Sequence, residues 1–335
     1  MNIKLKWVVL FELLLILFLL FLLFKNNYNY DWIDNKDSSL KLLSPRIYSG
    51  VLEPKSFLLV NYAPLKRDIE SYIIKNNLNV SLYVENLRSG SFIGIDERKG
   101  YPAASLAKVL TAILIMHRVE CNELSLDTMI DINDSYKSNS FGSLYNTTEK
   151  RLSLRVLIEK MLKKSDDTAF ITLMSLINKT DSTLFLNYFD YYSDDSVSNT
   201  KPYQDYEFGL VTSKSIYNIF SSLYLSTVLE PEHSEYILSL LTDTVFDIKK
   251  VADLPNEVIV SQKFGVMNQA NELFFHSCGI IYFDESRLFF CIMTKDLEED
   301  KASQVVGYIV NRVYNYAINA RSVFDHYKEE HSSYK

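Results

Sequence analysis

Apolar side chains recur along this chain with two different periods. A period near 3.6 residues, typical of amphipathic helices, marks residues 64–77, the region from 104 onward, and residues 152–163, 168–177 and about 301–320. A period of two, typical of strands, marks two runs within 79–97, around a turn at 88–90, and three runs at 257–266, 271–283 and 286–296. We therefore predict an α+β fold. An antiparallel five-stranded sheet is flanked by the terminal helices, and an all-helical subdomain is inserted between its strands.

The first part of the chain has a different pattern. Residues 7–24 are apolar except for Glu12, which is close to the length that spans a bilayer core. Lys4 and Lys6 precede this run, and positive residues favour the cytoplasmic side. We predict a single-pass anchor in the cytoplasmic membrane (residues 1–25, transmembrane 7–24), a polar linker (26–60), and an extracytoplasmic domain (61–325).

Composition excludes some classes of function. The net charge of −7 argues against nucleic acid as a partner. The three cysteines, Cys121, Cys278 and Cys291, form no zinc-ligand pattern, so we expect no metal and no cofactor. A bridge between Cys278 and Cys291 stays possible, but buried thiols on strands are the simpler interpretation. We expect a monomer.

A serine and a lysine open the longest apolar helix. Ser105 and Lys108 are three residues apart and therefore share one face of the first helical turn. A lysine amine beside a serine hydroxyl is one way to activate a nucleophile. An ordinary helix cap followed by a surface-reaching lysine is the alternative, since Ser-x-x-Lys also begins at Ser38, Ser198 and Ser332.

Two further motifs follow in order. Ser165-Asp166-Asp167 separates two predicted helices, where Ser and Asp are also common caps. Lys263-Phe264-Gly265 lies on a predicted strand, where a lysine can simply protect a sheet edge. Together the three motifs resemble the Ser-x-x-Lys, Ser-Asp-Asn and Lys-Thr-Gly set of class A β-lactamases and penicillin-binding proteins. The resemblance covers roughly residues 60–320.

The resemblance implies a role for each motif residue. Ser105 matches the acylated nucleophile, and Lys108 matches an amine that helps take its proton. Ser165 matches a hydroxyl that relays a proton to the leaving nitrogen. Lys263 would supply positive charge and attract a substrate carboxylate. Gly265 completes the third motif, and the family's second oxyanion N–H would come from Met267 or Asn268.

The sequence departs from the family pattern in three places. Asp167 stands where the family has Asn, and an ionised carboxylate can only accept hydrogen bonds. Phe264 replaces a Thr that helps bind the substrate carboxylate. No Glu-x-x-Leu-Asn pattern follows the second motif, so the candidates for a deacylating base are Asp194, Asp195 and Glu207.

We therefore expect a membrane-anchored serine hydrolase that transfers the acyl group of a β-lactam or a related amide through Ser105. One alternative is a D-alanyl-D-alanine carboxypeptidase of the penicillin-binding kind, acting on a peptidoglycan-type substrate. The other is a non-catalytic sensor or binding domain, because fold alone does not define function.

Overall fold

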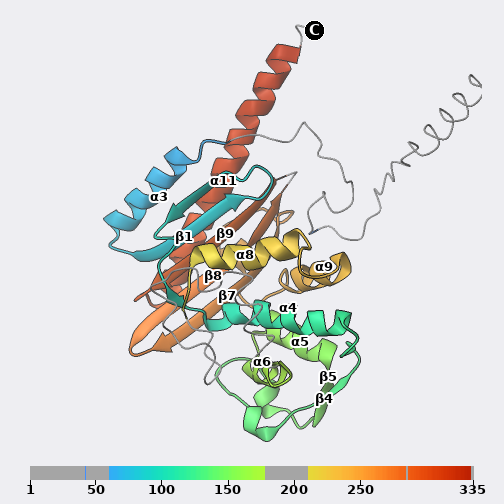
Figure 1. Ribbon diagram of the computed structural model, residues 1–335. Coiled ribbons are helices and arrows are strands. Elements are labelled where there is room, and N and C mark those ends of the chain that lie inside the picture. The colour runs from blue at the N-terminus through green and yellow to red at the C-terminus, as the bar shows by residue number, and fades with distance from the viewer. Residues whose placement is uncertain (1–41, 43–59, 178–209, 284–285, 333–335) are drawn as a thin grey trace, which may run out of the picture.

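The computed structural model describes Leu42 and residues 60–177, 210–283 and 286–332, the last with side chains up to residue 320 (Figure 1). The predicted anchor and, apart from Leu42 and Val60, the predicted linker lie outside these residues. In the described part of the chain, no helix combines the length and apolar character needed to cross a bilayer.

A five-stranded sheet forms the centre of the molecule. Its spatial order is β2 (Phe92–Ile95), β1 (Asn79–Asn86), β9 (Ser286–Lys295), β8 (Glu272–Phe283) and β7 (Ile259–Gln269), and every neighbouring pair is antiparallel. The prediction of one antiparallel sheet built from both ends of the chain is therefore confirmed. β7 is an edge strand, which leaves one side of it facing the helical region.

The middle strand β9 is buried on both faces, which explains its nearly continuous apolar sequence. Alternate side chains point to opposite faces of a strand. Leu288, Phe290 and Ile292 join a core with α3 (Ala63–Lys75) and α11 (Glu299–Ser332). The intervening side chains join a second core on the other face, shared with the inserted helices. Each terminal helix thus covers the sheet as predicted, although α11 extends well beyond the predicted end at 320.

The inserted region is organised around α4 (Ala107–Glu120). Its residues from Ala107 to Met116 are all buried. A helix that is apolar all round has to be enclosed. It contacts α5 (Leu154–Lys163), α6 (Asp167–Met174) and α9 (Pro231–Leu240) (Figure 1).

One further long helix and several short elements complete the described structure. They are η2 (Ala104–Leu106), η3 (Asp134–Tyr136), η4 (Leu144–Asn146), α8 (Ser213–Tyr224), α10 (Ile248–Val251), and the strand pairs β3 (Tyr101–Pro102) with β6 (Leu210–Val211) and β4 (Met129–Asp131) with β5 (Arg151–Ser153). α8 packs on β9 and β1, and η2 packs on β7. The pair β4–β5 lies within the inserted region, so the prediction that this region is all-helical is wrong. The two strands have three residues each, which is too short for a period of two to be recognised in the sequence.

The two strand cysteines differ from expectation. Cys278 on β8 and Cys291 on β9 stand directly opposite each other in the register. They are joined by a disulfide, so their interpretation as buried thiols is wrong. The sequence left this bridge open because the pairing of the two strands could not be fixed to one residue.

Candidate active site

The Ser105 hydroxyl lies where the helical region meets the edge of the sheet. Ser105 belongs to the short turn η2, which leads directly into α4. Ala104 before it adopts a left-handed backbone with φ of +46°, an uncommon conformation for a residue with a side chain. On β7, a Cβ added at Gly265 would lie 3.0 Å from the Ser105 backbone nitrogen. A side chain at this position would therefore require the strand and the Ser105 turn to move apart by a few tenths of an ångström.

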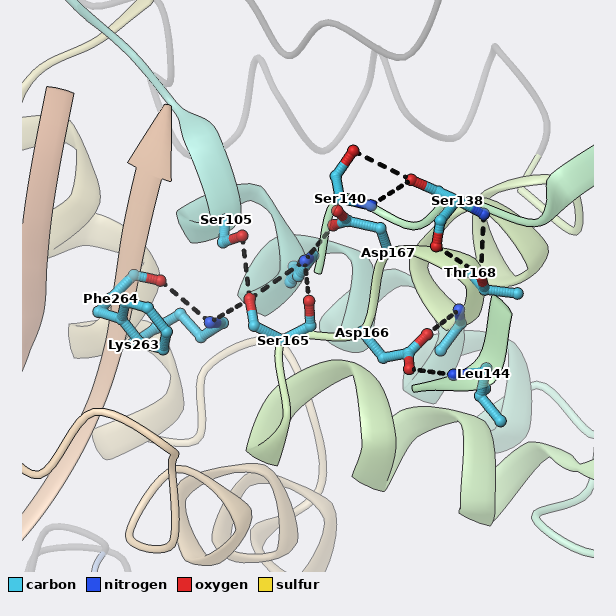
Figure 2. A network of polar contacts seen from close by, with 12 residues as sticks. Ser105, Ser138, Ser140, Leu144, Ser165, Asp166, Asp167, Thr168, Lys263 and Phe264 are labelled. Carbon is cyan, nitrogen blue, oxygen red and sulfur yellow. Dashed lines mark hydrogen bonds and ion pairs between the residues drawn. The ribbon is translucent and has the colours of Figure 1, made fainter. Parts of the chain in front are cut away.

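The three motifs meet in one polar group, which we call the hydroxyl–lysine cluster: Ser105, Lys108, Ser165 and Lys263. Ser165 is at its centre (Figure 2). Its Oγ donates to Ser105 Oγ at 3.0 Å, and accepts from Lys108 Nζ at 3.1 Å and from Lys263 Nζ at 2.9 Å. The Ser165 hydroxyl thus connects the predicted nucleophile to both amines.

Lys108 is bound as an ammonium ion would be. Besides Ser165 Oγ, its Nζ donates to the Ser165 carbonyl at 2.6 Å and to Asp167 Oδ1 at 2.6 Å. These three acceptors match the three donors of a charged lysine. Burial lowers the pKa of the Lys108 amine, while the Asp167 carboxylate acts in the opposite direction. The Asp that replaces the family's Asn is therefore the ion-pair partner of Lys108.

Lys263 has a different environment. Its side chain is fully buried, and its Nζ has two acceptors, Ser165 Oγ and the Phe264 carbonyl at 3.0 Å. A neutral amine has two donors and one lone pair, which suits this arrangement. Burial and then the nearby charge of Lys108 bring the pKa of Lys263 well below its ordinary value.

A buried carboxylate holds the chain around the cluster. Asp166 caps α6 by accepting from Ala169 N at 3.0 Å, and its other oxygen accepts from Ser143 N at 2.7 Å and Leu144 N at 2.9 Å. Gly142 lies so close that an added Cβ would be 2.2 Å from Asp166 Oδ2. Asp166 thereby ties the loop of residues 138–144 to the start of α6.

Above the cluster lies a pocket of about 610 Å³. Ser105, Lys108, Ser165 and Asp167 are among the residues that line it. The lining also includes four apolar side chains that we call the apolar rim: Phe141, Phe264, Val266 and Met267. Phe141 and Val266 are 38% and 36% exposed, so their apolar surface is open to a ligand.

The structure thus brings together most residues predicted for the site. Phe264 and Met267 line the same pocket as Ser105, and Gly265 contacts its backbone. The catalytic roles themselves stay predictions. Asp194, Asp195 and Glu207 lie outside the described residues.

Three features of the site were not predicted. Phe141 packs edge-on against Phe264 with ring centroids 5.7 Å apart, and Asp166 acts as a tether rather than as a cap alone. The buried His276 holds the chain before Ser105, because its Nε2 lies 3.0 Å from the Pro102 carbonyl. The one local signal for the contact between this loop and Asp166 was Gly142, a glycine in a polar loop of a chain that has few glycines.

A metal centre finds no support among the described residues. No group of three or more His, Cys, Asp or Glu side chains in this part of the chain is arranged to hold an ion.

Comparison with known proteins agrees with this geometry. A sequence model described as the beta-lactamase enzyme family matches residues 64–317. No curated protein gave a significant match.

Solved structures show the same fold at low identity. PBP-A, in an acyl-enzyme complex with penicillin G, aligns with a TM-score of 0.67 and 16% identity over 76% of this chain and 97% of its own. A β-lactamase from Xanthomonas campestris pv. campestris aligns with a TM-score of 0.66 and 20% identity over 77% of this chain and 100% of its own. The TLA-1 extended-spectrum β-lactamase aligns with a TM-score of 0.67 and 16% identity over 76% of this chain and 98% of its own.

Proposed function

Because the chain belongs to the beta-lactamase enzyme family, we propose that it is a serine hydrolase whose nucleophile is Ser105. The observation that carries this proposal is the hydroxyl–lysine cluster, in which Ser165 Oγ lies within 3.1 Å of Ser105 Oγ and of both lysine amines. Two buried amines that have one carboxylate, Asp167, among their hydrogen-bond partners have pKa values displaced from the ordinary value, and displaced pKa values are typical of active sites.

In the first step Ser105 Oγ attacks the carbonyl carbon of a β-lactam or a related amide or ester. Hydroxyl protons can rotate, so Ser105 can donate to Ser165, and Ser165 to the lone pair of Lys263. The Oγ–C bond forms, and the Ser105 proton moves through Ser165 to Lys263. The C–N or C–O bond then breaks, and the same path returns a proton to the leaving atom.

We assign the proton-accepting amine to Lys263 and the positive charge to Lys108. Lys108 is held in an ion pair and has three acceptors, whereas Lys263 has two acceptors, and neither of these two is an acid. This exchanges the roles that the family resemblance suggests. The physical cause is Asp167, whose carboxylate favours the charged form of Lys108 beside it.

The second step requires water to release the acyl group from Ser105. Water attacks the acyl carbon, the bond to Oγ breaks, and an acid leaves. We keep Asp194, Asp195 and Glu207 as candidates for the base that activates this water, on the basis of their position after the second motif alone.

We further propose that residues 7–24 anchor the enzyme in the cytoplasmic membrane, with the catalytic domain outside and a small-molecule or peptidoglycan-type substrate. The apolar run and the preceding Lys4 and Lys6 support this. Alkaline carbonate extraction of membranes, followed by protease treatment of intact spheroplasts, tests it. The chain should stay with the membrane and become cleavable from outside.

The experiment that tests the proposed activity is a time course with a fluorescent penicillin. The full-length chain and its Ser105→Ala variant are labelled in parallel and followed by gel and intact mass. Fast labelling with release of opened drug supports a β-lactamase. An adduct that persists for hours favours the carboxypeptidase-type or sensor alternatives. Equal labelling of both proteins would contradict Ser105 as the nucleophile.

A further inference from the structure

The charges around the pocket restrict which acyl donors reach Ser105. Among the described residues that line the pocket, Lys108 and Asp167 are the charged ones, and they pair with each other at 2.6 Å. Lys108 is 2% exposed, whereas Asp167 is 23% exposed. The more accessible of the two charges in the described lining is therefore the carboxylate.

The second lysine is not available to a ligand in the pocket. Lys263 is fully buried and is not one of the lining residues. Its Nζ lies 4.5 Å from the centroid of the Phe264 ring, and both acceptors of the amine belong to the protein. The family expectation that this lysine attracts a substrate carboxylate does not fit this position.

The rest of the lining is apolar or uncharged. Its six large apolar side chains are Phe141, Phe170, Leu210, Phe264, Val266 and Met267. Ser140, Asn268 and Gln269 can offer neutral hydrogen bonds. Among the described lining residues, an anion would meet aromatic rings and no cation other than the paired Lys108, so the hydration that it loses would not be replaced, and this is strongly unfavourable.

We infer that the site accepts acyl donors that carry no anionic group beside the scissile bond or on the acyl group, that is, uncharged esters or amides with an apolar acyl group. This inference rests on the proposed function, because it concerns what Ser105 acylates. Asp167 and Phe264 are the residues that determine this specificity. The first repels an anion, and the second separates Lys263 from the ligand.

A matched pair of substrates tests the inference directly. Penicillin G and its methyl ester share the same reactive ring and differ by one negative charge. The second-order rate of adduct formation at Ser105 is measured for each by intact mass with the full-length chain. We expect the methyl ester to react at least about tenfold faster, the scale at which a single substrate contact discriminates.

Variants connect that preference to the two residues. Asp167→Asn combined with Phe264→Thr should lower the ratio toward one or reverse it, and Asp167→Asn alone should lower it in part. Asp243→Asn is the control, since it removes a carboxylate that pairs with Lys163 on the surface. Its ratio should match that of the wild type. An unchanged ratio in both Asp167 variants would overturn the assignment of specificity.

The outcomes separate this inference from the proposed function. If neither penicillin reacts, p-nitrophenyl hexanoate is compared with the p-nitrophenyl monoester of adipic acid. In whichever pair reacts, an equal or faster rate for the anionic member overturns the inference and leaves Ser105 as the nucleophile. If none of the four compounds reacts in a Ser105-dependent way, the proposed function itself fails.

Discussion

The hydroxyl–lysine cluster and the apolar rim belong to the same pocket but differ in how far they follow the family pattern. The cluster has Ser105, Lys108, Ser165 and Lys263, all of the residue types that the family motifs require. The rim replaces a hydroxyl with the ring of Phe264 and places Phe141 against it. The machinery for acyl transfer is thus retained in residue type, while the surface that selects the acyl donor is different.

The largest expected effect on acyl transfer comes from removing the Lys263 amine, to which we assign the proton. Lys263→Met keeps the length of the side chain and removes the acceptor, so the rate of Ser105 acylation should fall by roughly 100-fold or more. Lys66→Met, at a half-exposed surface position, is the control and should leave the rate unchanged. A fall of less than tenfold in the Lys263 variant would mean that another group takes the proton.

Removing the Asp166 carboxylate should affect the stability of the fold more than the rate of acylation. Asp166→Ala leaves three backbone N–H groups without their acceptor in a site that is 1% exposed. We expect the free energy of unfolding to fall by about 3 kcal/mol, since each buried unsatisfied donor costs about 1 kcal/mol or more. Denaturant unfolding measures this.

Asp166→Asn is the matched variant, because it keeps one acceptor oxygen and should lose less. If both variants unfold like the wild type, the loop of residues 138–144 is not held by this carboxylate.

His276 supports the chain before Ser105 and should make stability depend on pH. Burial lowers the pKa of its imidazole to about 4, against 6.5 for an ordinary histidine. The unfolded chain therefore binds a proton before the native state does, so this contribution to stability is complete above pH 6.5 and is lost as pH falls toward 4.

Between pH 7 and pH 5 the wild type should lose about 2 kcal/mol more stability than His276→Gln. Thermal and denaturant unfolding at both pH values give the difference. The same loss in the two proteins would show that His276 does not titrate with a lowered pKa.

The smallest expected effect sharpens the assignment of charge within the cluster. The Asp167 carboxylate partly opposes the lowering of the pKa of both lysines. Without it the pKa of Lys263 should fall further. In Asp167→Asn the pH range over which the acylation rate rises should therefore move to lower pH. Asp243→Asn should leave this range in place, and a shift to higher pH in Asp167→Asn would contradict the ion-pair argument.

The sheet was predictable from the sequence because its strands are long and their apolar patterns are regular. The hairpin β1–β2 and the three late strands needed no knowledge of distant contacts. The end of α11 was not predictable, since helical spacing alone does not determine where a long helix stops. The Cys278–Cys291 bridge depended on a register that the pattern left free.

The site was predictable in its residues but not in its electrostatics. The motifs identified Ser105, Lys108, Ser165 and Lys263, although the hydrogen bonds within this cluster join residues 57 to 98 positions apart along the chain. Nothing local to Asp167 shows that its carboxylate reaches Lys108. Nothing local to Phe141 shows that it covers Phe264. Both contacts depend on how the loop of residues 138–144 and the start of α6 are fitted together by Asp166.

The measurement that tests the account most directly is the pH dependence of Ser105 adduct formation, followed by mass with the neutral member of the reacting substrate pair. Because burial and Lys108 bring the pKa of Lys263 well below its ordinary value, the rate should rise with pH and reach a plateau below pH 10.5. A rate that keeps increasing past pH 10.5 would contradict the buried amine as proton acceptor. An adduct on any residue other than Ser105 would contradict the site itself.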